Sequence, residues 1–116
     1  MQTIAVTGAS GFLARHIINQ LSDINCQVIP VSRERLSGAI HINNYKDTPK
    51  ADILIHLAED PDRARVNKAG RKYIEHSSNV ATALVEKFNG HVIYASSGTV
   101  YGDKGKSPYT IDSPTY

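Results

Sequence analysis

The sequence contains few of the residues that would indicate a disulfide, a metal site or a membrane segment. Its 116 residues include a single cysteine, Cys26, so no intramolecular disulfide can form, and a reducing compartment is indicated. The histidines are dispersed, with neither a paired cysteine nor an H-E-x-x-H motif, so we expect no metal site. A basic leader with an apolar run and a membrane-length apolar stretch are both lacking, which predicts a cytoplasmic protein with no membrane partner.

An excess of charge of one sign is lacking as well. Thirteen Lys and Arg residues stand against eleven Asp and Glu residues, a formal charge of +2, so we expect no nucleic-acid partner. The main basic cluster is expected to be a solvated helix face and comprises Arg63, Arg65, Lys68, Arg71 and Lys72. With 41% hydrophobic residues, the chain is typical of one ordinary globular domain spanning residues 1–116.

Short apolar segments alternate with segments of helical periodicity. The apolar segments predict strands at 3–7, 28–31, 39–42, 52–58 and 91–95. Helical spacing predicts helices at 11–22 and 67–88, the second ended by Asn89 and Gly90. Pro30 removes one hydrogen-bond donor from the second strand, which favours an irregular or outer position at that residue.

This alternation predicts an α/β fold with a doubly wound parallel sheet. Right-handed crossovers give about five strands in the order 3-2-1-4-5, which is a Rossmann-like arrangement. In such sheets the ligand lies at the carboxyl ends of the strands, where the strand order reverses. We therefore expect the functional residues in the loops after the first, fourth and fifth strands.

The loop after the first strand contains a glycine pattern, G-x-x-G-x-x-A, formed by Gly8, Gly11 and Ala14. Gly8 permits a tight turn, Gly11 lets the backbone approach a diphosphate, and Ala14 allows the helix to pack closely on the sheet. Free N–H groups at the start of the helix would bind an anion. The expected phosphate-binding residues are Ser10, Gly11, Phe12 and Leu13. The alternative is a glycine-rich turn without a ligand.

The end of the second strand indicates which dinucleotide would bind. Where an acidic residue would hold the ribose of NAD, the sequence reads Ser32-Arg33-Glu34-Arg35. Arg33 could pair with the 2′-phosphate of NADP while Ser32 adds a hydrogen bond, so NADP is favoured over NAD. Glu34 could still reach the ribose, and a surface arginine without a ligand is the other alternative.

Four segments resemble the extended short-chain dehydrogenase/reductase family: TGASGFLA near the start, HLAE ending at Glu59, NVAT from Asn79 and YASSGTVYGD from Tyr94. Within that family they are similar to the UDP-glucose 4-epimerase and sugar-nucleotide dehydratase branch. The resemblance implies an NAD(P)-dependent epimerase or dehydratase that acts on a nucleotide-linked sugar by hydride transfer. The Rossmann domain would be its cofactor-binding part.

The resemblance also implies further site residues. Leu57 and Ala58 would line the cofactor pocket after the fourth strand, and Asn44 with Tyr45 would lie near the adenine. After the fifth strand, the cofactor site would include Ala95 and Ser96. The second serine of this segment, Ser97, aligns with the catalytic Ser or Thr of the family, with Ser96 as the near alternative. Its hydroxyl would hydrogen-bond the substrate oxygen and assist proton movement.

The family's catalytic base is a tyrosine followed by a lysine four residues later. After Ser97, Tyr101 has Gly105 and Tyr109 has Ser113 at that spacing, while Tyr116 is the last residue of the sequence. We therefore expect an incomplete Rossmann domain, truncated before its last strands and inactive alone. The alternatives are a non-enzymatic dinucleotide-binding module, a homo-oligomer that assembles through the exposed edge of the fifth strand, and an NADP-sensing regulator.

Overall fold

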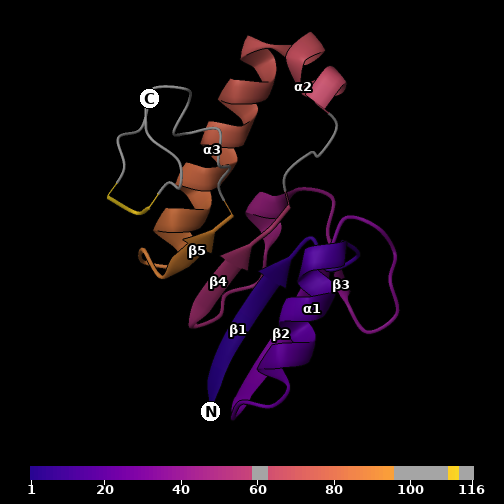
Figure 1. Cartoon of the computed structure of the whole chain (residues 1–116), viewed down its shortest axis with the longest axis vertical. Coiled ribbons are helices and arrows are strands. Elements are labelled where there is room, and N and C mark those ends of the chain that lie inside the picture. Colours follow the sequence, from indigo (N-terminus) through magenta and orange to yellow (C-terminus); the bar gives the residue numbers. More distant parts are fainter. Residues whose placement is uncertain (59–62, 96–109, 113–116) are drawn as a thin grey trace.

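The computed structural model describes residues 1–58, 63–95 and 110–112 (Figure 1). Its elements in chain order are β1 (Gln2–Thr7), α1 (Phe12–Leu21), β2 (Cys26–Ser32), β3 (Ile40–His41), the 3-10 helix η1 (Tyr45–Asp47), β4 (Ile53–His56), α2 (Arg63–Ala69), α3 (Arg71–Lys87) and β5 (Val92–Tyr94). Within these described ranges, no helix is long and apolar enough to cross a membrane.

The strands form one parallel sheet in the order β3-β2-β1-β4-β5, as the sequence predicts. The strand β1 is central, paired along its length with β2 and over Ile4–Thr7 with β4. Parallel strands have their carboxyl ends at the same edge, so the loops after β1, β2 and β4 come together there. The direction of the strand order reverses at β1, because β2 and β3 lie on one side of it and β4 and β5 on the other.

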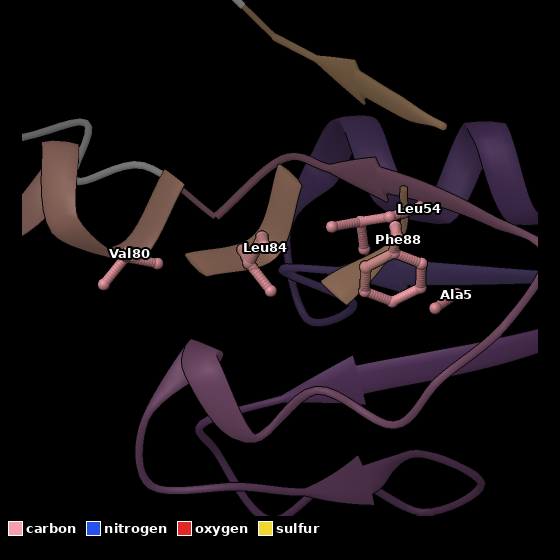
Figure 2. Packing of buried hydrophobic residues seen from close by; sticks show 5 residues of the cluster. All are labelled: Ala5, Leu54, Val80, Leu84 and Phe88. Atoms are coloured by element: carbon pink, nitrogen blue, oxygen red, sulfur yellow. The ribbon is translucent and has the colours of Figure 1, made fainter. Parts of the chain in front are cut away.

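Helices cover both faces of the sheet. Ile4 and Val6 of β1 lie in a buried cluster with Ala14 of α1, because alternate residues of a strand point to the same face. Ala5 points to the opposite face, where it joins a second cluster with Leu54 and the side chains of α3 (Figure 2). The result is three layers, with α1 and α3 on opposite sides of the sheet.

Pro30 lies in a strand that has neighbours on both sides. It is paired with Val6 of β1, whereas β3 begins to pair with β2 only at Val31. The carbonyl of Val31 accepts the N–H of Ala9 on the β1 side, so in a parallel ladder the preceding residue points its nitrogen to the other side. The nitrogen of Pro30, which has no hydrogen to donate, therefore points to the β3 side of β2. At that position β3 does not pair with β2, so no hydrogen bond of the sheet is lost.

The sequence predicts one long helix over 67–88, and this prediction is wrong in one respect. The structure contains two helices there, α2 and α3. Gly70 separates α2 from α3 and has φ 57° and ψ −127°. Residues with a side chain rarely adopt this backbone conformation, and it interrupts the helical hydrogen-bond pattern. The helix α2 consequently leaves the axis of α3 and lies beyond the carboxyl ends of the strands (Figure 1). The end of α3 agrees with expectation, since Asn89 and Gly90 have positive φ.

The connection between β3 and β4 contains η1, which the sequence pattern did not predict. Lys87 in the last turn of α3 donates through Nζ to the carbonyl oxygens of Lys46 and Thr48. Thr48 is fully buried and donates its hydroxyl to the carbonyl of Tyr45 at 2.6 Å. This connection is therefore held against the end of α3 by specific hydrogen bonds.

Candidate dinucleotide-binding site

The turn after β1 brings the backbone of two strand ends into close contact. Gly8 has φ 71°, and a Cβ atom placed on it would lie 3.2 Å from the backbone carbon of Leu57 and 3.3 Å from Cα of Ala58. The turn closes through a hydrogen bond of 2.9 Å from the Gly11 N–H to the Gly8 carbonyl. Glycine is required at position 8 both for its backbone conformation and for the approach of β4.

The first helix begins at this turn without a capping side chain. Its N-cap residue is Gly11, and the first turn of α1 contains no acidic residue. The first N–H groups of a helix have no partner within the helix, so they remain available to an anion. Ala14, only 1% exposed, packs this end of the helix on the sheet. This geometry agrees with the packing role expected for Ala14.

A cleft of about 630 Å³ opens in front of the helix start. This volume is in the range of small-molecule sites. The cleft is lined by Gly8, Ser10, Gly11, Phe12, Leu13, Ala14, Arg33, Glu34, Tyr45, Leu57, Ala58 and Arg65. The structure thus brings together most of the residues expected at the cofactor site.

Two apolar side chains of α1 belong to this cleft instead of the core. Phe12 is 72% exposed and Leu13 is 51% exposed, although both continue the apolar spacing of the helix. The core side of α1 is formed by Ala14 with the partly buried Ile17 and Ile18. The first turn of α1 therefore presents apolar surface beside its free N–H groups.

Arg33 and Tyr45 form one wall of the cleft. The guanidinium carbon of Arg33 lies 5.8 Å from the centre of the Tyr45 ring, a distance typical of a cation–π contact. Burial raises the pKa of the Tyr45 phenol, and this effect outweighs the nearby Arg33, which lowers it. Tyr45 is therefore a neutral hydrogen-bonding group near pH 7.

Two of the expected site residues shape turns and are absent from the cleft lining. Ser32 is 2% exposed, and its Oγ accepts the N–H of Glu34 at 3.0 Å. Asn44 caps η1, where its Oδ1 accepts the N–H of Lys46 at 2.9 Å. These bonds fix the backbone on either side of the wall formed by Arg33 and Tyr45.

A buried network positions the end of β4. The hydroxyl oxygen of Thr7 accepts the N–H of Leu57 at 3.1 Å and lies 2.7 Å from Nδ1 of His56. The His56 ring is 3% exposed and stacks edge-on with Tyr45, with ring centres 5.6 Å apart. Thr7 thereby fixes the backbone of Leu57 where it borders the cleft.

A smaller cavity of about 210 Å³ adjoins the cleft. The two share Arg33, Tyr45 and Ala58, so the wall described above separates them. The remaining lining residues of the smaller cavity are His56, Tyr73, His76, Ser77 and Val80. Tyr73, His76 and Ser77 of α3 supply half of its polar residues.

Several expected site residues follow β4 and β5. Ala95 is described, and its N–H donates to the carbonyl of His56 at 3.3 Å. Glu59, Ser96, Ser97, Tyr101, Tyr109 and Tyr116 lie outside the described residues. In the part of the chain that the structure describes, no group of three or more His, Cys, Asp or Glu residues could hold a metal ion.

Arg65 is a cleft residue that sequence reasoning missed. It was expected on a solvated helix face with the rest of the basic cluster, yet it also lines the cleft. The spacing of basic residues carried no signal for this position. The break at Gly70, which separates α2 from α3, could only be suspected from the glycine itself.

Comparison with known proteins agrees with this geometry. The sequence model of the NAD-dependent epimerase/dehydratase family matches residues 4–116. A UDP-glucose 4-epimerase of Neisseria meningitidis serogroup A is 25% identical over 142 aligned positions, which cover 98% of this chain and 42% of that protein. The chain therefore spans less than half the length of this curated relative.

Solved structures share the fold. One is a UDP-glucose 4-epimerase from Stenotrophomonas maltophila with bound NAD and formylated UDP-arabinopyranose. It has a TM-score of 0.81 at 18% sequence identity, and the match covers 100% of this chain and 43% of that chain. A UDP-glucose 4-epimerase from Bifidobacterium longum, in complex with NAD+ and UDP, has a TM-score of 0.79 at 22% sequence identity. That match covers 98% of this chain and 42% of the other chain. The family match over residues 4–116 shows that the chain belongs to the NAD-dependent epimerase/dehydratase family.

Proposed function

We propose that this chain binds the dinucleotide cofactor of an enzyme that epimerises or dehydrates a nucleotide-linked sugar by hydride transfer. The observation that carries the proposal is the uncapped start of α1, which faces a cleft of about 630 Å³ at the carboxyl edge of the sheet. The N–H groups there would hold the diphosphate, and Gly8 allows the backbone to come close enough. The nicotinamide would supply the hydride-accepting and hydride-donating chemistry.

Within this proposal, Arg33 favours NADP over NAD. Its guanidinium lines the cleft beside Tyr45 and could form a paired hydrogen bond with a 2′-phosphate. Glu34 also lines the cleft and could bind the ribose hydroxyls of NAD. Ser32 supports this wall from a buried position, through its bond to the Glu34 N–H.

The adenine would lie against Tyr45. The Tyr45 ring borders both the cleft and the smaller cavity of about 210 Å³, so it offers an aromatic face to a bound ring. Asn44 would act indirectly by holding η1 in place. Leu57 and Ala58 would add apolar lining to the cleft.

Calorimetric titration with NADP, NAD and ADP-ribose tests the proposed site. All three ligands share the diphosphate, so all should bind if the start of α1 is the phosphate seat. NADP should bind more tightly than NAD if Arg33 acts as proposed. Failure of all three to bind would contradict the dinucleotide site, whereas tighter binding of NAD would contradict only the NADP preference.

For the chemical step we propose Ser97 as the residue whose hydroxyl bonds the substrate oxygen, with Ser96 as the alternative. After Ser97, neither Tyr101 nor Tyr109 has a lysine four residues later. A tyrosine without that lysine keeps a high pKa and is a weak base. The 116-residue chain should therefore bind cofactor without turning over a nucleotide sugar, and cofactor-dependent turnover by this chain would contradict that expectation.

A second candidate is a non-enzymatic module that self-associates. Among the described strands β5 is an outer strand, and Ile93 on it is 59% exposed and Tyr94 45% exposed. An apolar outer strand can pair with a strand of another chain. Size-exclusion chromatography with light scattering separates the two ideas, because a strict monomer contradicts assembly through β5.

A further inference from the structure

The part of the cleft wall that carries Tyr45 receives little support from the sheet. Tyr45 begins η1, which follows β3, and β3 pairs with β2 through only two residues, Ile40 and His41. Among the described strands, β3 is also an outer one. The parallel pairing therefore ends before η1, so the orientation of the Tyr45 side chain depends on contacts outside the sheet.

The last turn of α3 supplies such contacts. Lys87 donates through Nζ to the carbonyl oxygen of Lys46 inside η1, and at 2.9 Å to the carbonyl oxygen of Thr48, the C-cap of η1. Carbonyl groups at the end of a helix have no partner within the helix, and a cation is a favourable donor to them. One ammonium group thus joins the end of α3 to two carbonyls at the end of η1.

The residue after Lys87 fixes the position of this end of α3. Phe88 is 3% exposed and packs in the buried cluster with Ala5 and Leu54 on the α3 face of the sheet (Figure 2). Because Lys87 directly precedes Phe88, its backbone cannot move away from the sheet without exposing the Phe88 ring. The hydrogen bonds of Lys87 therefore connect η1 to the core of the molecule.

Thr48 continues this connection to Tyr45. Thr48 is fully buried, and its hydroxyl and its N–H both donate to the carbonyl oxygen of Tyr45, at 2.6 and 3.1 Å. The partly buried side chain of Tyr45 packs against the cluster that contains Phe88, and it lines both the cleft and the smaller cavity. A shift of η1 would therefore move the Tyr45 ring relative to the cleft.

We propose that Lys87 is a positioning residue for cofactor binding, which holds η1 so that the Tyr45 ring faces the adenine end of the dinucleotide. Lys87 is not among the residues that line the cleft or the smaller cavity, so it acts through Tyr45 and not by contact with the ligand. This inference rests on the proposed function and adds to it a residue that determines how strongly the adenosine half binds.

The test is calorimetric titration of the full chain and its variants with ADP-ribose and with inorganic pyrophosphate. Lys87→Met keeps an unbranched apolar side chain but removes both hydrogen bonds to η1. If η1 then occupies its present position about a tenth of the time, the affinity for ADP-ribose falls about tenfold. Pyrophosphate has no base and needs only the start of α1, so its affinity should stay the same.

Three further variants complete the comparison. Lys87→Arg keeps the charge and the N–H donors, so it should recover part of the loss. Lys72→Met removes an exposed charge from the same helix and should bind both ligands as the unaltered chain does. Lys87→Gln, which keeps an N–H donor on a shorter side chain, gives the same ratio of affinities to measure if Lys87→Met does not fold.

Amide hydrogen exchange provides a readout that needs no ligand. The N–H groups of Asp47 and Thr48 donate to carbonyl oxygens three residues earlier. In Lys87→Met these two amides should exchange at least about tenfold faster, while the amide of Val6 in the centre of β1 should exchange as before. ADP-ribose should restore their slow exchange, because it binds only when η1 is in place.

The results that would overturn the inference differ from those that would overturn the proposed function. If the unaltered chain binds ADP-ribose and Lys87→Met binds it equally well, the inference is wrong while the dinucleotide site stands. If Lys87→Met weakens pyrophosphate as much as ADP-ribose, the lost charge explains the effect and the inference is wrong. Faster exchange of all three amides together would also overturn it, because Lys87 would then support the whole fold. If the unaltered chain binds neither ligand, the proposed function fails and the inference fails with it.

Discussion

The hydroxyl oxygen of Thr7, at the end of β1, lies 2.7 Å from Nδ1 of His56 at the end of β4. The same oxygen accepts the N–H of Leu57 at 3.1 Å, so one side chain joins two neighbouring strand ends. Both Thr7 and His56 are buried. The edge of the sheet from which the cleft opens is therefore held by polar bonds that are shielded from water.

Replacing Thr7 with valine should destabilise the fold. Valine has nearly the same shape but leaves the Leu57 N–H and the His56 ring nitrogen without this partner, a loss of about 1–3 kcal/mol. The free energy of unfolding, measured by urea denaturation, checks this expectation. Thr82→Val at an exposed site on α3 is the matched control and should change stability by less than about 0.5 kcal/mol. Equal effects of the two substitutions would contradict the role given to Thr7.

Replacing Gly8 with alanine should cost more stability than the same change at Gly38. Both residues have positive φ, 71° and 81°, so alanine at either site carries a conformational penalty of about 1–2 kcal/mol. A Cβ atom at Gly38 would meet no atom within 4 Å, whereas at Gly8 it would press on the backbone of Leu57 and Ala58. The difference between the two unfolding free energies isolates the close approach. Equal values would show that β4 can shift without cost.

Replacing Arg33 with alanine should reduce the affinity for NADP and leave the affinity for NAD nearly unchanged. The guanidinium is the group proposed to bind the 2′-phosphate, and loss of a charge-assisted bond there would weaken NADP roughly tenfold. Paired titrations with the two cofactors measure this directly. Arg35→Ala, which removes an exposed neighbouring arginine outside the cleft lining, should retain the original preference. If Arg33→Ala weakened the affinities for NADP and NAD equally, Arg33 would contribute to dinucleotide binding in general and not to the preference for NADP.

Replacing Asp52 with asparagine should make the protein less sensitive to acid. The Thr3 N–H at 2.8 Å, followed by the Thr3 hydroxyl, holds the pKa of Asp52 below its usual value. A carboxylate with a lowered pKa in the folded state adds stability above its unfolded pKa. That stability is lost as pH falls through the folded pKa. Urea denaturation across the acid range should show a shallower decline for Asp52→Asn.

Thr3→Val provides the complementary change. It removes the hydroxyl that donates to Asp52 but keeps the backbone N–H, so it should reproduce part of the effect on the pH profile. If both variants decline with pH as steeply as the unaltered chain, the pair between β1 and the start of β4 does not contribute to acid sensitivity.

The sheet was predictable because its signals are local and repeated. Each strand is a short apolar segment, and the handedness of crossovers then restricts the order of the strands. The glycine turn was predictable for the same reason, since Gly8, Gly11 and Ala14 satisfy packing and backbone requirements at fixed spacing.

The structure differs from the sequence-based predictions where tertiary contacts determine the conformation. Apolar spacing could not show that Phe12 and Leu13 face a cleft, because a site wall and a core have the same periodicity. The backbone angles of Gly70 are not encoded by its identity alone, so the break between α2 and α3 was missed. Ser32 was expected to serve a ligand, and its oxygen is engaged in a turn.

The bonds from Lys87 to the connection between β3 and β4 have a consequence for the order of events during synthesis. The wall that carries Tyr45 receives these bonds only when the last turn of α3 has left the ribosome, some forty residues after the wall itself. A nascent chain that ends before Lys87 would contain the glycine turn but not a fixed partner opposite it. If the chain binds a dinucleotide as proposed, capture of the cofactor during translation should begin late, after α3 has docked.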